Sequence, residues 1–147
     1  VASDWISDGV LTQLAYDRFT AKAHGIDPIP TLDAPCLSGR GSSLPTLQDM
    51  IKQAEHAILV TNFWYIRTVN PTDLTLTGMT RDGTFLVEKG AIVSAVKNFR
   101  FHESPLRVFN RIEAFTNPAE AITSETSKLL VPAMTLNDFN FSSVTRF

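Results

Sequence analysis

The three histidines of this chain are the residues best suited to hold a catalytic metal, and their spacing argues against that role. His24, His56 and His102 lie far apart in the sequence, and no H-E-x-x-H or H-E-x-x-x-H motif is present. A helical zinc site needs two histidines within a turn or so of each other, so that both side chains project from one face. We therefore predict that this chain by itself binds no metal cofactor.

A run of hydrolase-type residues, His102-Glu103-Ser104, also invites a catalytic interpretation. Neighbours in sequence rarely face a common site, and catalytic triads are normally assembled from separate segments. Ser104 precedes Pro105, as a residue that caps a helix does. We predict that Ser104 is a helix cap and that the chain has no triad.

Two other motifs are weak. Cys36 lies in a stretch rich in proline and serine with only Arg40 as a nearby cation, so nothing predicts a lowered thiol pKa, and we interpret it as an incidental thiol. The run GRGSS at 39–43 resembles a phosphate-binding loop but lacks the Gly-Lys-Ser/Thr ending and a preceding strand.

The aromatic run NFWYIR at 62–67 has two interpretations. Aromatic residues on both faces of a strand most simply form core, whereas aromatics beside a cation also suit a peptide-binding groove. Arg81-Asp82 is most simply a turn pair, with a functional role as the alternative. The candidate peptide-groove residues are Trp64, Tyr65, Arg67 and Arg81, and no catalytic or metal-binding residue is assigned.

About three short helices are predicted to support these residues. Asp17 and Gly25 have the residue types of the start and end of one helix, and His24 lies in its last turn. Thr46 and Asp49 resemble a capping box at the start of a helix over 46–56. A third helix is expected from Pro105 to about residue 110. The proline-rich segment 26–45 between the first two is predicted to be an irregular connection.

Strands are predicted for most of the remaining chain. Asp8-Gly9 predicts a hairpin turn. AILVTNFWYI from 57 to 66 predicts a central strand covered on both faces. The runs RDG at 81–83 and EKG at 88–90 predict two further turns, and hence three strands in a meander. The segment 128–141 predicts a strand that breaks at Asn137-Asp138. Five residues are expected to be buried: Leu47, Phe85, Val87, Val93 and Phe99.

These elements predict an α+β fold with a curved, antiparallel, barrel-like β-sheet meander. A length of 147 residues favours a single domain over 1–147. The net charge of −2 offers no basic face for nucleic acid, and no apolar run reaches the ~18 residues of a membrane span. One cysteine and no recognisable signal peptide favour a cytoplasmic protein.

The order of these motifs resembles the C-terminal domain of the TldD/PmbA family of metallopeptidases, also named modulators of DNA gyrase. The resemblance is carried by AILVTNFWYIRTVNPTDLTLTGMTRDGTFLVEKGAIVSAVKNFRFHESPLRVF, by SDGVLTQLAYDRFTAKAHG, which is similar to the family's ENGVL hairpin and following helix, and by LLVPAMTLNDFNFSS. It covers nearly the whole chain.

The resemblance implies a zinc peptidase whose H-E-x-x-x-H helix lies upstream of the matched region and is absent from this chain. It also implies a zinc-binding cysteine near the C-terminus, just before the family's L-I-P-like strand, where this chain reads ITSETSKLLVP with Thr126 near the expected position. The family includes subunits without zinc ligands that pair with an active subunit. The implied partners are therefore an N-terminal half or a homologous subunit, as a homodimer or heterodimer, and an unfolded peptide substrate.

Two functions follow as expectations. The first is a C-terminal scaffold and substrate-groove domain of a metallopeptidase, inert as an isolated chain. The second is a non-catalytic partner subunit of an active homologue. The start at Val1, close to the first hairpin, suggests a cut strand that leaves a sheet edge open and favours association with another chain.

Overall fold

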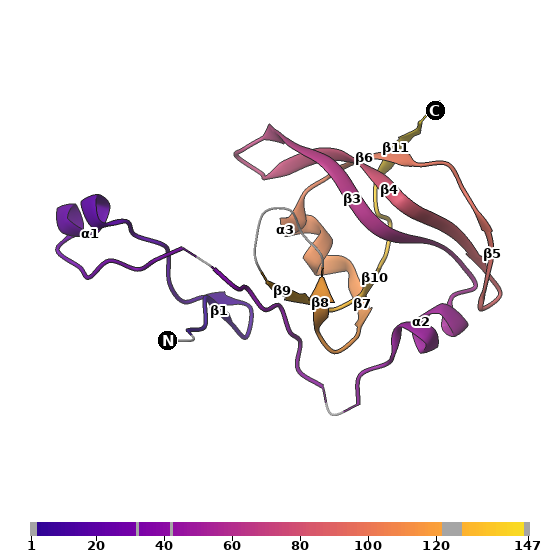
Figure 1. Ribbon diagram of the computed structural model, residues 1–147, viewed down its shortest axis with the longest axis horizontal. Helices are drawn as coiled ribbons and strands as arrows, with labels where there is room; N and C mark the ends of the chain where they lie inside the picture. The colour runs from indigo at the N-terminus through magenta and orange to yellow at the C-terminus, as the bar shows by residue number, and fades with distance from the viewer. Residues whose placement is uncertain (1–2, 32, 42, 122–127, 146–147) are drawn as a thin grey trace. The chain divides into compact units, whose positions relative to one another are not determined.

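The computed structural model describes residues 3–31, 33–41, 43–121 and 128–145 (Figure 1). The chain divides into two compact units. The first comprises Val1–Cys36 and Glu120–Leu130, and the second comprises Leu37–Ala119 and Val131–Phe147.

Local sequence signals explain the first unit. Strands β1 (Ile6–Ser7) and β2 (Val10–Leu11) pair across a two-residue turn, in which Asp8 and Gly9 have φ of 51° and 78°. Helix α1 (Arg18–His24) begins where the Asp17 carboxylate accepts a hydrogen bond of 2.7 Å from the Thr20 N–H. It ends at Gly25, whose φ is 66°. The predicted hairpin and helix are both confirmed.

The segment 26–45 has no helix or extended strand in its described part, as predicted. Its backbone makes isolated bridges, Tyr16 with Ile29 and Cys36 with Leu130, and Cys36 itself is exposed. The short strands β8 (Ala119–Ala121) and β9 (Leu129–Val131) pair with each other.

The second unit contains helix α2 (Leu47–Gln53) and a five-stranded antiparallel sheet. The predicted capping box is present, since Thr46 and Asp49 exchange side-chain and backbone hydrogen bonds. The strand order is β11-β6-β4-β3, and β5 pairs with β4 beyond the end of β6. The strands are β3 (His56–Asn70), β4 (Thr75–Glu88), β5 (Ala91–Ala95), β6 (Phe99–Glu103) and β11 (Phe141–Val144).

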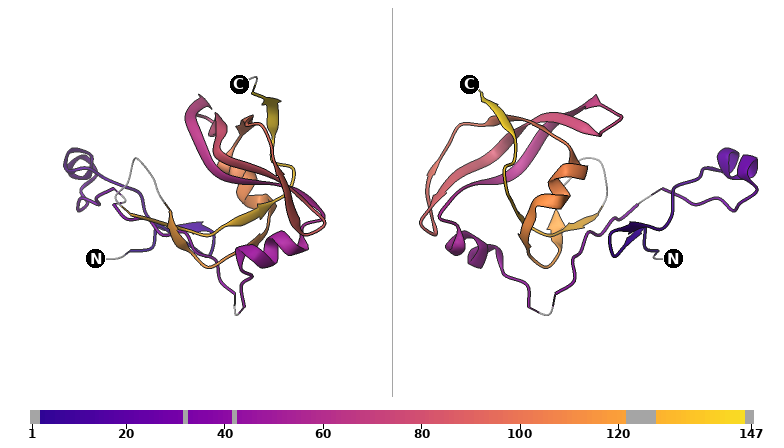
Figure 2. Two further views of the ribbon diagram at one scale, coloured as in Figure 1. Left: turned by 45° about the vertical axis from the view of Figure 1, so that its right-hand side comes forward. Right: turned by 180° about the vertical axis from the view of Figure 1, so that it is seen from behind.

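Figure 2 shows the long β3–β4 hairpin twisting as it runs across this unit. The α+β class and the curved antiparallel sheet are confirmed, and the sheet is open at its edges. The EKG turn is also confirmed, because Lys89 and Gly90 have positive φ and join β4 to β5.

The predicted turn at Arg81-Asp82-Gly83 is wrong. Strand β4 continues through these residues, and Asp82 and Gly83 together oppose the single residue Thr61 of β3. This is a β-bulge, and it needs the same positive φ as a hairpin turn: 57° at Asp82 and 143° at Gly83. The residues do adopt the predicted positive φ, but the pairing with β3 makes this position a bulge and not a turn.

The prediction that β3 is a central strand is also wrong. Among the described residues strand β3 pairs with β4 alone and lies at the edge of the sheet. Residues 57–60 are half-buried, and every residue from Thr61 to Asn70 is exposed. The apolar pattern on both faces therefore belongs to an edge strand that is not covered on both sides.

The remaining elements of this unit are short. Helix α3 (Pro105–Val108) continues into a 3₁₀ turn, η1 (Phe109–Arg111), close to the predicted helix. Strands β7 (Ile112–Phe115) and β10 (Met134–Leu136) pair with each other. The predicted break at Asn137-Asp138 is present, with Asp138 at a φ of 51°.

The core of the second unit is small and partly aromatic. Val87 and Phe101 are buried, and Phe101 packs against Phe63 and Phe139 at ring-centroid distances of 5.2 and 5.7 Å. Of the residues expected in the core, Val87 is buried and Phe85 and Phe99 are half-buried. Val93 and Leu47 are exposed, contrary to prediction. Val93 belongs to β5, all five residues of which are exposed, and Leu47 lies in the first turn of α2. No helix in the described part of the chain is long and apolar enough to cross a membrane.

Candidate functional site

The four predicted groove residues lie on the β3–β4 hairpin, where two bulges orient them. At the first bulge, Thr61 Oγ1 donates to the carbonyls of Asp82 and Gly83 at 3.3 and 3.0 Å, and Asn62 Nδ2 donates to Asp82 Oδ2 at 3.1 Å. These contacts fix the strand beside Arg81.

The second bulge places Tyr65 and Ile66 opposite Gly78. Tyr65 has a φ of 57°. A Cβ at Gly78 would lie 2.7 Å from the Phe101 ring and 3.1 Å from the Trp64 carbonyl oxygen. Glycine is therefore required where the bulged edge strand lies close to the aromatic core.

The structure groups the four residues into two cation–π pairs. The Arg81 guanidinium carbon lies 4.6 Å from the centroid of the Trp64 ring, and that of Arg67 lies 4.3 Å from the Tyr65 ring. All four side chains belong to exposed residues. At such sites a cation–π contact contributes only about 0.5–1 kcal/mol, so the pairs hold the cations in position without burying them.

The Trp64–Arg81 pair lines a hollow. Its volume is about 270 Å³, and its lining residues are Trp64, Met79, Thr80, Arg81, Asn98 and Thr145. The hollow contains part of a hydroxyl–amide network, in which Thr80 and Thr84 both donate to Asn98 Oδ1, at 3.2 and 3.1 Å. Thr80 Oγ1 also accepts from the Phe99 N–H at 3.0 Å. Tyr65 and Arg67 do not line this hollow.

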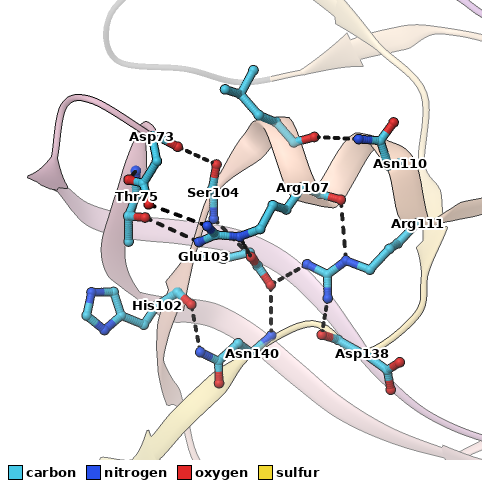
Figure 3. A network of polar contacts seen from close by, with 11 residues as sticks. Asp73, Thr75, His102, Glu103, Ser104, Arg107, Asn110, Arg111, Asp138 and Asn140 are labelled. Atoms are coloured by element: carbon cyan, nitrogen blue, oxygen red, sulfur yellow. Dashed lines mark hydrogen bonds and ion pairs between the residues drawn. The ribbon is translucent and has the colours of Figure 1, made fainter.

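A second polar region surrounds Glu103, at the end of β6 (Figure 3). The Glu103 carboxylate accepts hydrogen bonds from Arg111 Nη2, from the Ser104 N–H at 2.9 Å and from the Asn140 N–H at 3.3 Å. Arg111 Nη1 also donates to the carbonyl of Asp138. Glu103 is only 5% exposed, so its charge depends on these donors.

The neighbouring Ser104 and Arg107 connect this region to the β3–β4 turn (Figure 3). Ser104 is fully buried, and its hydroxyl donates to the carbonyl of Asp73 at 2.7 Å. Arg107 donates to Asp73 Oδ2 at 3.4 Å and to Thr75 Oγ1 at 3.2 Å. Ser104 occupies the predicted cap position, but its side chain makes no capping bond, because the turn at Asp73 takes the hydroxyl instead.

Opposing effects determine the ionisation of Glu103. Burial raises the pKa of this carboxyl, whereas the Arg111 hydrogen bond, the N–H groups of Ser104 and Asn140, and the Arg111 charge lower it. The net result is a pKa below the ordinary value. Glu103 is therefore an anion at neutral pH, held by its donors.

This region also borders an open hollow of about 530 Å³, lined by His102, Glu103, Arg107, Asn110, Arg111 and Asn140. The Arg111 guanidinium already donates to Glu103, to Asp138 and, at 3.4 Å, to the carbonyl of Arg107. Because the donors bind protein groups, the chemistry of this region is structural: it joins β6, the β3–β4 turn, α3–η1 and the segment before β11. We name Glu103, Ser104, Arg107, Arg111 and Asp73 the Glu103 network.

Sequence reasoning missed this network, although a signal existed. Glu103, Arg107 and Arg111 recur every fourth residue, the spacing at which side chains form ion pairs on a helix, although Glu103 itself lies at the end of β6. The contributions of Asp73 and Asn140 come from distant segments, and no spacing rule indicates them.

The histidines do not come together in a metal site. His24 packs edge-on against Tyr16, with ring centroids 5.9 Å apart, and His56 Nδ1 lies 3.5 Å from Glu88 Oε1. His102 borders the Glu103 network. Among the described residues no group of three or more His, Cys, Asp or Glu side chains is placed to hold a metal ion, so these residues do not fit a zinc site. Thr126, near the position expected for the family's cysteine, lies outside the described residues.

The second unit therefore defines an α+β domain with an open, bulged sheet edge and an ionic network around the buried Glu103. The sequence model of the family described as the PmbA/TldA metallopeptidase C-terminal domain matches residues 2–143, and the chain belongs to this family. No curated protein matches it significantly.

Two solved structures share the fold. TldE from Thermococcus kodakarensis is 15% identical with a TM-score of 0.69, and the match covers 92% of this chain and 32% of that one. A candidate modulator of DNA gyrase from Bacteroides thetaiotaomicron is 22% identical with a TM-score of 0.73, and the match covers 95% of this chain and 30% of that one. The chain thus spans about a third of the length of these relatives.

Proposed function

We propose that this chain is the C-terminal scaffold and substrate-groove domain of a cytoplasmic TldD/PmbA-type zinc metallopeptidase that acts on unfolded peptides. In this proposal residues 1–147 act as one functional domain. The zinc-binding helix belongs to a part of the protein outside these residues, and an N-terminal half or a homologous subunit completes the enzyme.

The observation that carries this proposal is the exposed edge of β3. Strand β3 has β4 on one side and no partner among the described residues on the other, and residues 61–70 are exposed throughout. An extended peptide can add to such an edge through main-chain hydrogen bonds, while its side chains enter neighbouring hollows. The exposed Trp64, Tyr65 and Ile66 offer apolar contacts along the same edge.

The chain's own residues bind and orient the peptide in this proposal, and none performs the chemical step. The described histidines lie on α1, β3 and β6, and they form no group suited to zinc. We therefore expect the isolated chain to carry no stoichiometric zinc and to show no thermal shift with added zinc or chelator, since a ligand bound only by the native state would raise its stability.

Peptide cleavage by three preparations tests this function: the isolated chain, the longer protein that contains it, and the longer protein with its zinc-binding motif mutated. We expect chelator-sensitive cleavage of unfolded peptides only from the intact longer protein. We further expect Trp64→Ala in that protein to raise KM more than it lowers kcat, because it removes a binding contact. Chelator-sensitive cleavage by the isolated chain would refute the proposal.

A non-catalytic partner subunit is the second candidate. The sequence from 122 to 132 has no cysteine at the place where the resemblance predicts a zinc ligand, which favours this alternative. The parent reading frame separates the two: an H-E-x-x-x-H motif supports the peptidase, and its absence supports the partner subunit. Sedimentation of the chain with an active homologue would then detect the expected complex.

A further inference from the structure

The hollow beside Trp64 and Arg81 has the chemistry of a side-chain pocket, and its assignment rests on the proposed peptide-binding function. Its volume of about 270 Å³ is large enough to admit one amino-acid side chain. Trp64 lies on the edge strand β3 where a peptide would add, and Arg81 lies on β4 beside it. A peptide residue facing this side of β3 would meet both side chains.

Two side chains that line this hollow, Arg81 and Asn98, offer hydrogen-bond donors. The Arg81 guanidinium stacks on Trp64 at 4.6 Å, and it makes no hydrogen bond within the described residues. Asn98 uses its Oδ1 to accept from Thr80 and Thr84, so its Nδ2 group is left without a hydrogen-bond partner in the described part of the chain. The hollow thus combines a cation and an amide N–H₂ with the apolar surfaces of Trp64 and Met79.

The nearest anion does not neutralise this cation effectively. Arg81 Nε lies 3.4 Å from Asp82 Oδ1, and the two side chains are 49% and 63% exposed. Such exposed pairs contribute little, because water solvates both charges. The other Asp82 oxygen accepts from Asn62. An incoming carboxylate can therefore bind the remaining guanidinium donors.

We propose that this hollow is a specificity pocket for an aspartate or glutamate side chain of the bound peptide. The carboxylate binds the Arg81 guanidinium and the Asn98 amide, and the methylene groups lie against Trp64 and Met79. Stacking on the indole holds the guanidinium in place before the peptide arrives, which reduces the entropy lost on binding.

Matched peptides test this pocket in the full-length protein. Three sets of extended peptides, scanned along their length, differ only by Glu, Gln or Lys at one position, and calorimetry measures each Kd. We expect the Glu peptide to bind roughly five- to tenfold more tightly than its Gln twin at one position, as for a charge-assisted hydrogen bond. Arg81→Gln should abolish this preference, Arg81→Lys should retain part of it, and Arg81→Glu should favour the Lys peptide.

The control is Lys89→Glu, which makes the same change of charge in the turn after β4 and should leave the preference intact. Equal binding of Glu and Gln peptides at every position would overturn the pocket while leaving peptide binding in place. An equal loss of preference in Lys89→Glu and Arg81→Glu would also overturn it, because long-range charge would then explain the effect. Absence of binding by every peptide would refute both the pocket and the proposed function.

Discussion

Arg111 and Arg81 lie in the same unit, and their guanidinium groups have opposite surroundings. Arg111 bonds a carboxylate whose side chain is 6% exposed, whereas Arg81 stacks on an exposed indole and is itself 49% exposed. Arg111 is half-buried beside a buried carboxylate, and its hydrogen-bond partners come from within the protein. At the surface, water replaces a partner at little cost, so the cation remains available to a ligand.

Gly78 lies where the edge strand approaches the core. A Cβ added at this position would lie 2.7 Å from the buried Phe101 ring and 3.1 Å from the Trp64 carbonyl oxygen. The exposed edge is therefore supported directly by the core, and a change in either region tests how far they are coupled.

Phe101→Ala should cause the largest loss of stability, about 3–5 kcal/mol, because it removes a buried ring that packs against Phe63 and Phe139. Urea denaturation measures the loss. The control is Phe109→Ala, which alters a ring that is 53% exposed and should cost under about 1 kcal/mol. Equal losses would mean that the buried Phe101 ring stabilises the fold no more than the exposed Phe109 ring does.

Glu103→Ala should destabilise the chain by about 3 kcal/mol. It leaves the Arg111 guanidinium without its anion and the Ser104 N–H without the carboxylate that accepts its hydrogen bond. Glu88→Ala is the matched control, because Glu88 pairs with His56 at an exposed site and its loss should cost under about 1 kcal/mol. Chemical denaturation of both variants gives the difference. A small effect of Glu103→Ala would make the network dispensable.

Gly78→Ala should cost about 2 kcal/mol, because its Cβ would overlap the Phe101 ring. The same variant should change the fluorescence of Trp64, measured with Trp5 replaced by Phe, if the core and the edge are coupled. Destabilisation with an unchanged Trp64 signal would show that the edge moves independently.

Acid should remove the part of the stability that depends on the Glu103 charge. The pKa of Glu103 is held below its ordinary value of 4.5, despite burial, by its hydrogen bonds and the Arg111 charge. The stabilisation is therefore complete above about pH 4.5 and is lost as the pH falls through the lower, folded-state pKa. Melting temperatures of the wild type should fall more steeply below pH 4.5 than those of Glu103→Gln, and parallel curves would contradict this.

Arg81→Ala should have the smallest effect on stability, under about 1 kcal/mol, because its contacts with Trp64 and Asp82 are exposed. Its effect on peptide affinity should be larger than its effect on the melting temperature. A loss of stability comparable with that of Glu103→Ala would place Arg81 in a structural network instead.

Local sequence signals predicted the elements better than the candidate site. The hairpin at Asp8-Gly9, the caps at Asp17 and Thr46, and the turn at Lys89-Gly90 all depend on residues within a few positions of each other. The candidate aromatic and cationic residues were chosen from their types. Their grouping into two pairs, and the hollow beside Trp64 and Arg81, required the register of β3 against β4.

By itself the sequence determined the α+β class, both ends of α1, the start of α2 and the two hairpin turns, because φ preferences and side-chain caps act over a few residues. Only the tertiary structure decided that Arg81-Asp82-Gly83 is a bulge, that β3 is an edge, and that Ser104 bonds Asp73 rather than its own helix. A positive φ suits a bulge and a turn equally, and an apolar strand looks the same whether or not another layer covers it. The choice depends on which distant segments supply hydrogen bonds and contacts, and those partners are set by the fold as a whole.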